Sequence, residues 1–366
     1  MRKNVVIVST YPEHGSKNIG DRLITNKLKE LLSEIGDYSY KIVWRAAPWA
    51  EVKDIVLFAD HVFFACLAIR PNMHIDEYPY LTQVAESGVP FSVISAGTDL
   101  KVSDFESIFK GFSEGSIRAL KLVNERAVSL TTRGYLSQEF CLNMGLKNFK
   151  FSGDVAFYNR VLNEPFISNI DIKKIVISDP HRAELYIESF ECLHAGLRNQ
   201  FPRAEIVVAQ HGVNNVVDTF CKNNDIKTVK IYERPDKGLE IYDNADLHVG
   251  FRVHAHVSAL SRKVYSYLLE QDGRGCDYGL TLNRKISVPC YKQFSPRVSI
   301  KGILKFIVRG SSPFHPRVSI SAAQQILSII RQDSEQGFLK FEGLENQISG
   351  FTDSLYSTVR KSLAEF

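Results

Sequence analysis

Short apolar runs alternate with longer amphipathic segments along most of the chain. Runs of about four to eight apolar residues predict buried strands, and apolar residues three and four positions apart predict helices. Strands are expected at residues 5–9, 41–44, 61–68, 91–96, 127–131 and 149–151, and then at 174–178, 205–209, 228–232, 247–250 and 264–269. Helices are expected at 21–35, 183–201, 215–223, near 238–244 and from about residue 254. Strands separated by helices are typical of parallel α/β sheets.

The pattern lapses once, between residues 158 and 169, where Pro165 falls, and then restarts. We therefore expect two Rossmann-like domains, at residues 1–160 and 170–310, followed by a helical C-terminal extension at 311–366. Two such domains joined once predict a cleft between the carboxyl ends of their sheets, where ligands bind. In the extension, helices are expected at 322–331 and 352–363, with an apolar stripe of Leu355, Val359 and Leu363. This stripe either packs on a domain or lies on a membrane surface.

Composition narrows the class of protein. The 366 residues are 44% hydrophobic and 23% charged, as in ordinary globular proteins, and two domains are expected for this length. The net charge of +4 is too small to indicate a nucleic-acid partner, and it suits anionic substrates or anionic lipid equally. Asp60 and His61 interrupt the longest apolar stretch, so we expect no membrane span, and the apolar run at residues 5–8 is too short for a signal sequence. Six cysteines without a CxxC pair are expected as buried thiols, which suits the cytoplasm.

The strongest candidate for chemistry lies at residues 246–256. A buried strand is expected to end at Gly250 and a helix to follow, so that Arg252, Val253 and His254 lie at the carboxyl edge of the second sheet. A cation and an imidazole at a helix N-terminus suit a phosphorylated acid. His254 and His256 are two positions apart and point to nearly opposite sides of a helix, so no metal site is expected and His256 is assigned a structural role.

Three further segments in the first half of the chain contain residue types that could bind an anion or orient a neighbouring group. Gly15 to Asp21, with Asn18 and Gly20, connects a strand to a helix, and its amides either meet an anion or form a turn capped by Asp21. Arg133 follows a strand and is expected to face the cleft, unless it forms a surface ion pair. Gly153 and Asp154 are more readily explained as structural residues.

Weaker candidates follow other strands of the second half. They are His181, Arg182, Gln210, His211, Glu270 and Arg274. All follow predicted strands, and the carboxyl ends of parallel strands meet at one edge of a sheet, so all of them could face the cleft. The alternative for each is a solvated loop.

The motifs together resemble the polysaccharide pyruvyl transferase family. The order Asn18-Ile19-Gly20-Asp21, Arg133-Gly134 to Ser137, Gly153-Asp154-Val155-Ala156, and Asp246 to Gly250-Phe251-Arg252-Val253-His254 carries this resemblance, which covers most of residues 4–275. The resemblance implies a fold like that of two-domain GT-B glycosyltransferases. It also implies transfer of the enolpyruvyl unit of phosphoenolpyruvate to a sugar, usually as a cyclic ketal, with Arg133 and Arg252 holding the donor and His254 catalytic. No cofactor is implied beyond this donor substrate.

The sequence departs from the family pattern at three places. Phe64-Ala65-Cys66-Leu67 stands where a glycine-rich stretch is usual, Leu260 to Val264 lacks a Gly-x-Pro, and Asp272-Gly273-Arg274 replaces an Asp-x-Lys. These changes bear on the acceptor sugar, which is a lipid-linked saccharide, a nucleotide sugar or a free glycan end. Asp21 is the second catalytic candidate. The phosphoenolpyruvate side is expected in the second domain and the acceptor side in the first.

Two other functions remain open at this point. One is a sugar-nucleotide-dependent glycosyltransferase of the same architecture, since a fold does not determine a function. The other is a non-catalytic sugar- or phosphate-binding module. For the enzyme we expect a role in capsule or exopolysaccharide biosynthesis in the cytoplasm, with peripheral association at the inner face of the membrane as an alternative.

Overall fold

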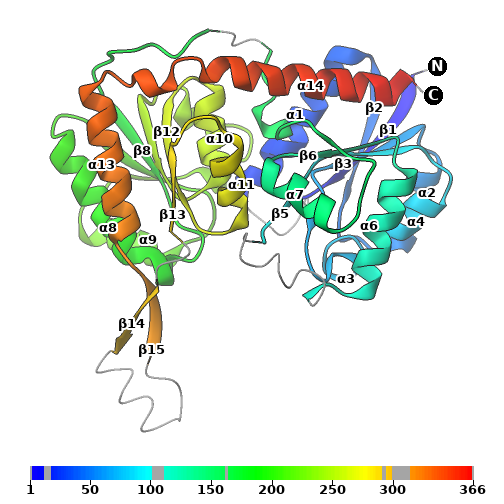
Figure 1. Cartoon of the computed structure of the whole chain (residues 1–366), viewed down its shortest axis with the longest axis horizontal. Helices are drawn as coiled ribbons and strands as arrows, with labels where there is room; N and C mark the ends of the chain where they lie inside the picture. The colour runs from blue at the N-terminus through cyan, green and yellow to red at the C-terminus, as the bar shows by residue number, and fades with distance from the viewer. Residues whose placement is uncertain are drawn as a thin grey trace. The chain divides into compact units, whose positions relative to one another are not determined.

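The structure is a computed structural model that describes residues 2–11, 18–100, 111–160, 164–290, 294–298 and 314–364. The chain divides into two compact units (Figure 1). Unit 1 contains residues 1–165, 272–284 and 343–366, and unit 2 contains residues 166–271 and 285–342. The first boundary falls inside the expected linker. Neither unit is one continuous stretch, however, so the division differs from the expected 1–160, 170–310 and 311–366.

Unit 1 is built on a parallel sheet. Its strands are β1 (Lys3–Ser9), β2 (Tyr38–Trp44), β3 (His61–Ala65), β5 (Phe91–Thr98), β6 (Ser129–Thr132) and β7 (Lys150–Phe151), in the order β2-β1-β3-β5-β6-β7, and the short β4 (Ala68–Ile69) pairs with β5. Its helices are α1 (Ile19–Ile35), α2 (Trp49–Leu57), α3 (Met73–Asp76), α4 (Leu81–Glu86), α6 (Glu114–Arg126), α7 (Tyr135–Asn143), α11 (Gly273–Thr281) and α14 (Leu344–Ala364), with the 3-10 helix η2 (Val155–Phe157).

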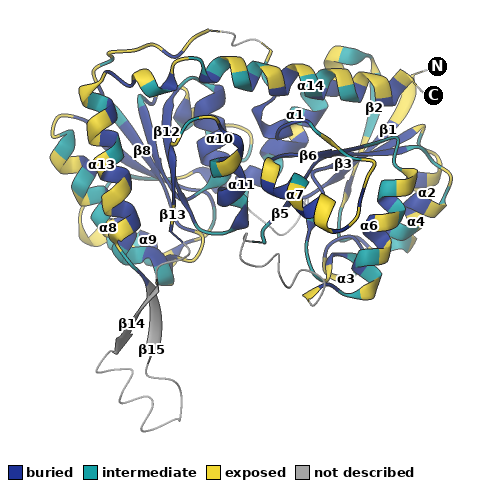
Figure 2. Cartoon of the chain, viewed as in Figure 1, coloured by how far each residue is buried: buried dark blue, intermediate teal, exposed yellow. Residues whose placement is uncertain are grey.

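The central strands of this sheet are buried on both faces. Every residue of β3 and β5 is buried, so neither strand alternates regularly between apolar and polar positions (Figure 2). The C-terminal helix α14 packs on α1, η2 and β6. Its expected stripe of Leu355, Val359 and Leu363 is buried in this contact, so the stripe packs on a domain.

Unit 2 contains a second parallel sheet. Its strands are β8 (Lys174–Ser178), β9 (Glu205–Gln210), β10 (Thr228–Lys230), β11 (Leu247–Gly250), β12 (Tyr265–Glu270) and β13 (Ser287–Pro289), in the order β10-β9-β8-β11-β12-β13. Its helices are α8 (Ala183–Gln200), α9 (Asn215–Asn223), α10 (Val253–Ser261) and α13 (Ser321–Glu335), with the 3-10 helices η3 (Ile231–Glu233), η4 (Gly238–Tyr242) and η5 (Leu339–Phe341). Strands β14 (Phe294–Val298) and β15 (Phe314–Val318) form an antiparallel pair.

The expected fold class is confirmed: two parallel-sheet α/β domains with a helical C-terminal segment. The cleft between the domains stays a prediction. Helices α2, α3, α4, α6 and α11 were not expected from the sequence, and the helix expected near 238–244 is the 3-10 helix η4. The last helix, expected at 352–363, begins at Leu344. All six cysteines are free thiols, and five are buried as expected, whereas Cys192 is only partly buried. Within the described ranges, no helix is both long and apolar enough to cross a membrane.

Candidate active site

Arg252 lies where the buried strand β11 passes into helix α10. It is the N-cap residue of α10, so the free amides of the first helical turn and its guanidinium lie together at the carboxyl edge of the sheet. The guanidinium is held by Asp179, which follows β8. Nε and Nη2 of Arg252 donate to the carboxylate oxygens of Asp179 at 3.0 and 2.7 Å. This paired geometry fixes the plane of the guanidinium.

Asp179 is fully buried and accepts two further hydrogen bonds. The backbone amide of His211 donates at 2.9 Å and Nδ2 of Asn214 at 3.0 Å. Asn214 in turn caps α9 by accepting from the amide of Val217. The carboxylate of Asp179 therefore connects the carboxyl ends of β8, β9 and β11, and positive charge and hydrogen-bond donors compensate for its burial.

Two histidines of the predicted set lie with Arg252. His254 is buried in the first turn of α10, after Val253, the first helical residue. His211 is also buried, with Nε2 at 2.7 Å from the hydroxyl of Tyr242. Burial lowers the pKa of His211 well below its usual value, and the charges of Arg252 and His254 lower it further. His211 is therefore neutral at physiological pH.

The other residues predicted at this edge are more dispersed. His181 is exposed, and its Nδ1 lies 3.3 Å from Nη1 of Arg252. Arg182 is exposed at the N-cap of α8. Gln210 donates to Asp218 at 2.6 Å, and Glu270 accepts from Ser287 at 2.7 Å. Of the weaker candidates, His181 and His211 thus lie with Arg252, whereas Gln210 and Glu270 form hydrogen bonds with Asp218 and Ser287.

In unit 1, Arg133 is a buried residue. It follows β6, and its Nε donates to Asp277 of α11 at 3.2 Å while Nη2 donates to the carbonyl of Thr98 at 2.8 Å. Asp277 also accepts from the hydroxyl of Ser137 at 2.5 Å and from the amide of Leu136 at 2.9 Å. Arg133 is 6% exposed. The expected alternative, a surface ion pair, is wrong in one respect, because the pair is buried.

Asp21 lies in the first turn of α1, three residues after the N-cap, so the expectation that Asp21 itself caps this turn is wrong. Asn18 caps the helix by accepting from the amide of Gly20 at 3.2 Å, and its Nδ2 donates to Asp21 at 3.1 Å. Burial raises the pKa of Asp21, and the charges of Arg45, Arg274 and Arg70 partly oppose this. Gly15, Ser16 and Lys17 of the same motif lie outside the described residues.

Arg274 belongs to unit 1, although it was expected in the second domain. Nη2 of Arg274 lies 2.6 Å from Oδ2 of Asp272, and Asp272 is the N-cap residue of α11. The structural assignment of Asp154 agrees with its contacts, since it caps η2 and accepts from the hydroxyl of Tyr278.

Asp179, Asn214 and Asp277 were not among the residues expected from the sequence. Asp179 offered a signal, because it directly follows a predicted strand. Asp277 offered none, because it lies within a helix that was not expected.

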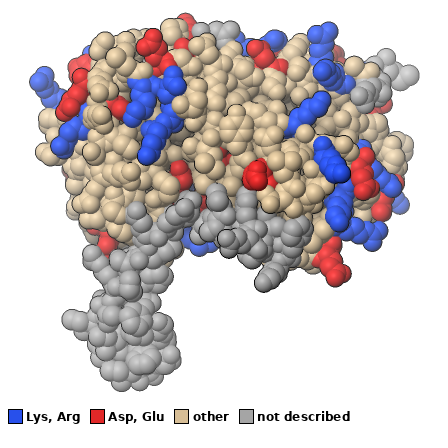
Figure 3. Space-filling model, viewed as in Figure 1, with Lys and Arg blue, Asp and Glu red and all other residues tan. Residues whose placement is uncertain are grey.

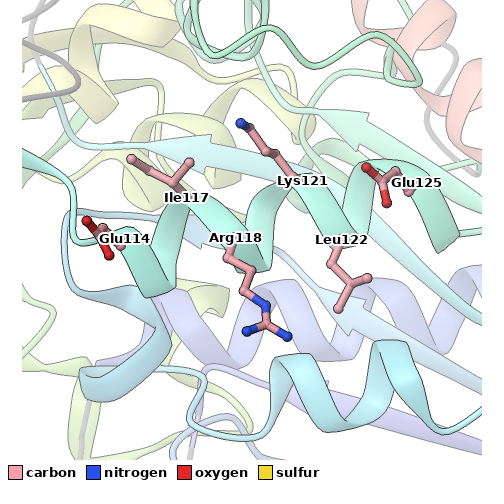
Figure 4. Close-up of a pocket in the computed structure, with 6 residues that line it drawn as sticks. All are labelled: Glu114, Ile117, Arg118, Lys121, Leu122 and Glu125. Carbon is pink, nitrogen blue, oxygen red and sulfur yellow. The ribbon is translucent and has the colours of Figure 1, made fainter.

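Other features lie away from these residues. Among the described residues, no group of three or more His, Cys, Asp or Glu is arranged to hold a metal ion. An open groove of about 400 Å³ is lined, among the residues that the structure describes, by side chains of α6 from Glu114 to Glu125 (Figure 4). On the face shown in Figure 3, acidic and basic side chains are interspersed.

A family model described as "Polysaccharide pyruvyl transferase" matches residues 18–272, well over half of the chain. The chain belongs to this family. The matched range includes Asn18, Asp21, Arg133, Arg252 and His254, and it ends before Arg274. No curated protein matched the chain in sequence.

Solved structures support the fold. UDP-GlcNAc 2-epimerase from Neisseria meningitidis, bound to UDP-GlcNAc, is 13% identical with a TM-score of 0.51, and the match covers 100% of each chain. A putative UDP-N-acetylglucosamine 2-epimerase from Listeria monocytogenes is 12% identical with a TM-score of 0.48, covering 92% of this chain and 98% of that one. The wall teichoic acid polymerase TagF, as its H444N variant, is 13% identical with a TM-score of 0.44, covering 99% of this chain and 90% of that one. Only the first of these structures has a TM-score above 0.5, and at 13% identity it shows the fold alone.

Proposed function

We propose that the protein transfers the enolpyruvyl unit of phosphoenolpyruvate to a pair of sugar hydroxyls and so forms a pyruvate ketal. The observation that carries this proposal is Arg252, fixed by the buried Asp179 at the start of α10 beside His254, in a member of this family. In this proposal the protein acts in the biosynthesis of a surface polysaccharide, and the reaction takes place in the cytoplasm or at the inner face of the membrane. The acceptor is a lipid-linked or nucleotide-linked sugar.

The donor brings a carboxylate and a phosphate, and both need cationic or N–H donors. Asp179 occupies Nε and Nη2 of Arg252, so the Nη1 side, which lies towards the exposed His181, is the side assigned to the donor. The amides at the N-terminus of α10 add positive potential there. Arg133 is the second donor-binding arginine in this proposal, on the strength of the family resemblance.

His254 is proposed to deliver a proton to the methylene carbon of phosphoenolpyruvate. Protonation makes C2 cationic, and a sugar hydroxyl then bonds to C2 and loses its proton to a base. Departure of phosphate and attack by the second hydroxyl, which also loses its proton, close the ketal. Asp21 is proposed as the base, because burial raises its pKa and so strengthens it as a proton acceptor.

The test of the reaction is the product. Purified protein is incubated with phosphoenolpyruvate and candidate acceptors, and phosphate release and product mass are measured. A ketal adds a pyruvate unit to the acceptor and releases one phosphate. Addition of a hexose from a sugar nucleotide would instead establish a glycosyltransferase, and donor binding without turnover on any acceptor would indicate a binding module.

The donor contact is tested by calorimetry with phosphoenolpyruvate. Arg252→Ala should weaken binding roughly ten- to hundredfold, since a hydrogen bond to a charged group contributes about 1.5–3 kcal/mol. Arg252→Lys should restore binding only in part, because a point charge lacks the planar fork. Unchanged affinity in Arg252→Ala would remove the proposed donor site.

The proton transfer is tested at His254. His254→Gln should lower turnover by about 10²–10⁴-fold while donor affinity changes far less. His194→Ala, at a histidine on α8, is the control and should keep wild-type turnover. A His254→Gln enzyme within a few-fold of wild type would reject His254 as the proton donor.

A further inference from the structure

A chain of buried hydrogen bonds runs from the amide of Arg252 into the core of unit 2. The amides of Phe251 and Arg252 both donate to Oγ of Ser178, at 3.1 and 3.2 Å. Nε2 of His248 lies 3.0 Å from the same oxygen. Oγ of Ser266 lies 2.7 Å from Nδ1 of His248 and 2.7 Å from Nδ1 of His256. These four side chains are fully buried.

The two amides fix the direction of the chain from Ser178 to Ser266. A serine oxygen accepts two hydrogen bonds and donates one. Because two amides take both acceptor sites of Ser178, its proton must be donated to Nε2 of His248. The neutral His248 then carries its proton on Nδ1 and donates it to Ser266. Towards His256, Ser266 can either donate or accept, because its oxygen has a second acceptor site.

Both histidines have the neutral form that this chain requires. Burial lowers the pKa of His256 to about 3 and that of His248 well below its usual value. Strand packing keeps Ser178 close to the turn, because Gly250 pairs with Ser178 and a Cβ at residue 250 would lie 2.2 Å from its Oγ. Ser178 is therefore held directly beneath the residues that begin α10.

We propose that Ser178, His248 and Ser266 are positioning residues for Arg252, acting through this one-way hydrogen-bond chain. The inference rests on the proposed function only for the purpose of the positioning, which is binding of phosphoenolpyruvate. Ser266 is the acceptor for the Nδ1–H of His248. Without Ser266 this buried proton has no acceptor, so we expect it to move to Nε2, and three donors then compete for the two acceptor sites of Ser178. One of the two amides loses its partner, and Arg252 with its guanidinium loses its fixed place.

The chain itself is tested without any substrate. Nitrogen-15 spectra of histidine-labelled protein distinguish the tautomers, and hydrogen exchange reports on the amides of residues 251 and 252. The wild type should show Nδ1–H at His248. Ser266→Ala should switch His248 to Nε2–H and speed exchange of at least one of the two amides more than tenfold. The opposite tautomer of His248 in the wild type, or unchanged exchange in the variant, would overturn the proposal.

Positioning is tested by binding of phosphoenolpyruvate to the same proteins. Ser266→Ala should weaken binding about tenfold, and Ser266→Thr, which keeps the hydroxyl, should restore it in part. The matched control is Ser258→Ala, which removes another fully buried serine of the same region. Ser258 accepts a hydrogen bond from Arg262 and is not part of the hydrogen-bond chain from Ser178 to Ser266. Equal losses in Ser258→Ala and Ser266→Ala, or unchanged affinity in Ser266→Ala, would reject positioning. A wild type that binds no phosphoenolpyruvate would instead refute the proposed function, and the spectra would still decide whether the chain exists.

Discussion

A single buried carboxylate, that of Asp179, makes four polar contacts at the proposed donor site. Removing it in Asp179→Ala leaves the guanidinium of Arg252 largely buried without its partner, which should lower the free energy of unfolding by about 3 kcal/mol. Donor affinity should fall roughly tenfold or more, because Arg252 is no longer oriented. Urea unfolding and calorimetry measure the two effects. A variant within 1 kcal/mol of wild type would show that Asp179 is not needed to compensate the charge of Arg252.

Burial of Arg133 changes what its substitution should do. From the sequence, replacement by alanine would remove a donor contact and leave folding intact. In the structure, Arg133→Ala leaves the buried carboxylate of Asp277 without its cation, so we expect about 3–5 kcal/mol of lost stability. Arg133→Lys should lose less, since a cation remains. Unfolding curves must therefore precede any interpretation of activity, and a fully stable Arg133→Ala protein would contradict the buried pair.

At the scale of elements, the start of α11 is closely packed against the end of β5. A Cβ at Gly273 would lie 1.9 Å from the carbonyl oxygen of Leu100, so Gly273→Ala must displace the helix or the loop. We expect a loss of about 1–3 kcal/mol. Gly350 in α14 has no neighbour within 4 Å of its Cβ position, and Gly350→Ala should stabilise by about 0.5–1 kcal/mol. Thermal unfolding compares the two, and equal effects would refute the close packing at Gly273.

Buried neutral histidines should make the whole molecule sensitive to acid. Burial lowers the pKa of His61 in unit 1 and of His256 in unit 2 to about 3, whereas an unfolded histidine titrates near 6.5. The unfolded state therefore binds protons first, and this stability is complete above about pH 6.5 and is lost as the pH falls towards 3. At pH 5 each histidine should cost about 2 kcal/mol. Urea unfolding of His61→Gln and of the wild type between pH 7.5 and 5 measures the contribution of His61 to this loss of stability. If the free energies of unfolding of the two proteins fall in parallel with pH, His61 makes no such contribution.

The sequence by itself determined the alternation of strands and helices. The strand at residues 174–178 and the helix at 215–223 have their predicted bounds, because each is a local pattern of apolar residues. The local pattern also placed Arg252 and His254 at a helix start, since the end of β11 and the start of α10 are adjacent in sequence. Helix α11 was missed because it is short and contains three glycines, which are weak helix formers.

The tertiary structure alone decided which side chains hold these residues. Arg252 meets Asp179 from 73 positions away, and Arg133 meets Asp277 from 144 positions away. No local pattern encodes such pairs, because they depend on which strands become neighbours in a sheet and on the return of residues 272–284 to unit 1. His256 shows the same limit. Its position in the sequence assigned His256 a structural role, apart from His254. Only the packing of α10 on β12 brings His256 to Ser266, where one hydroxyl contacts two histidines.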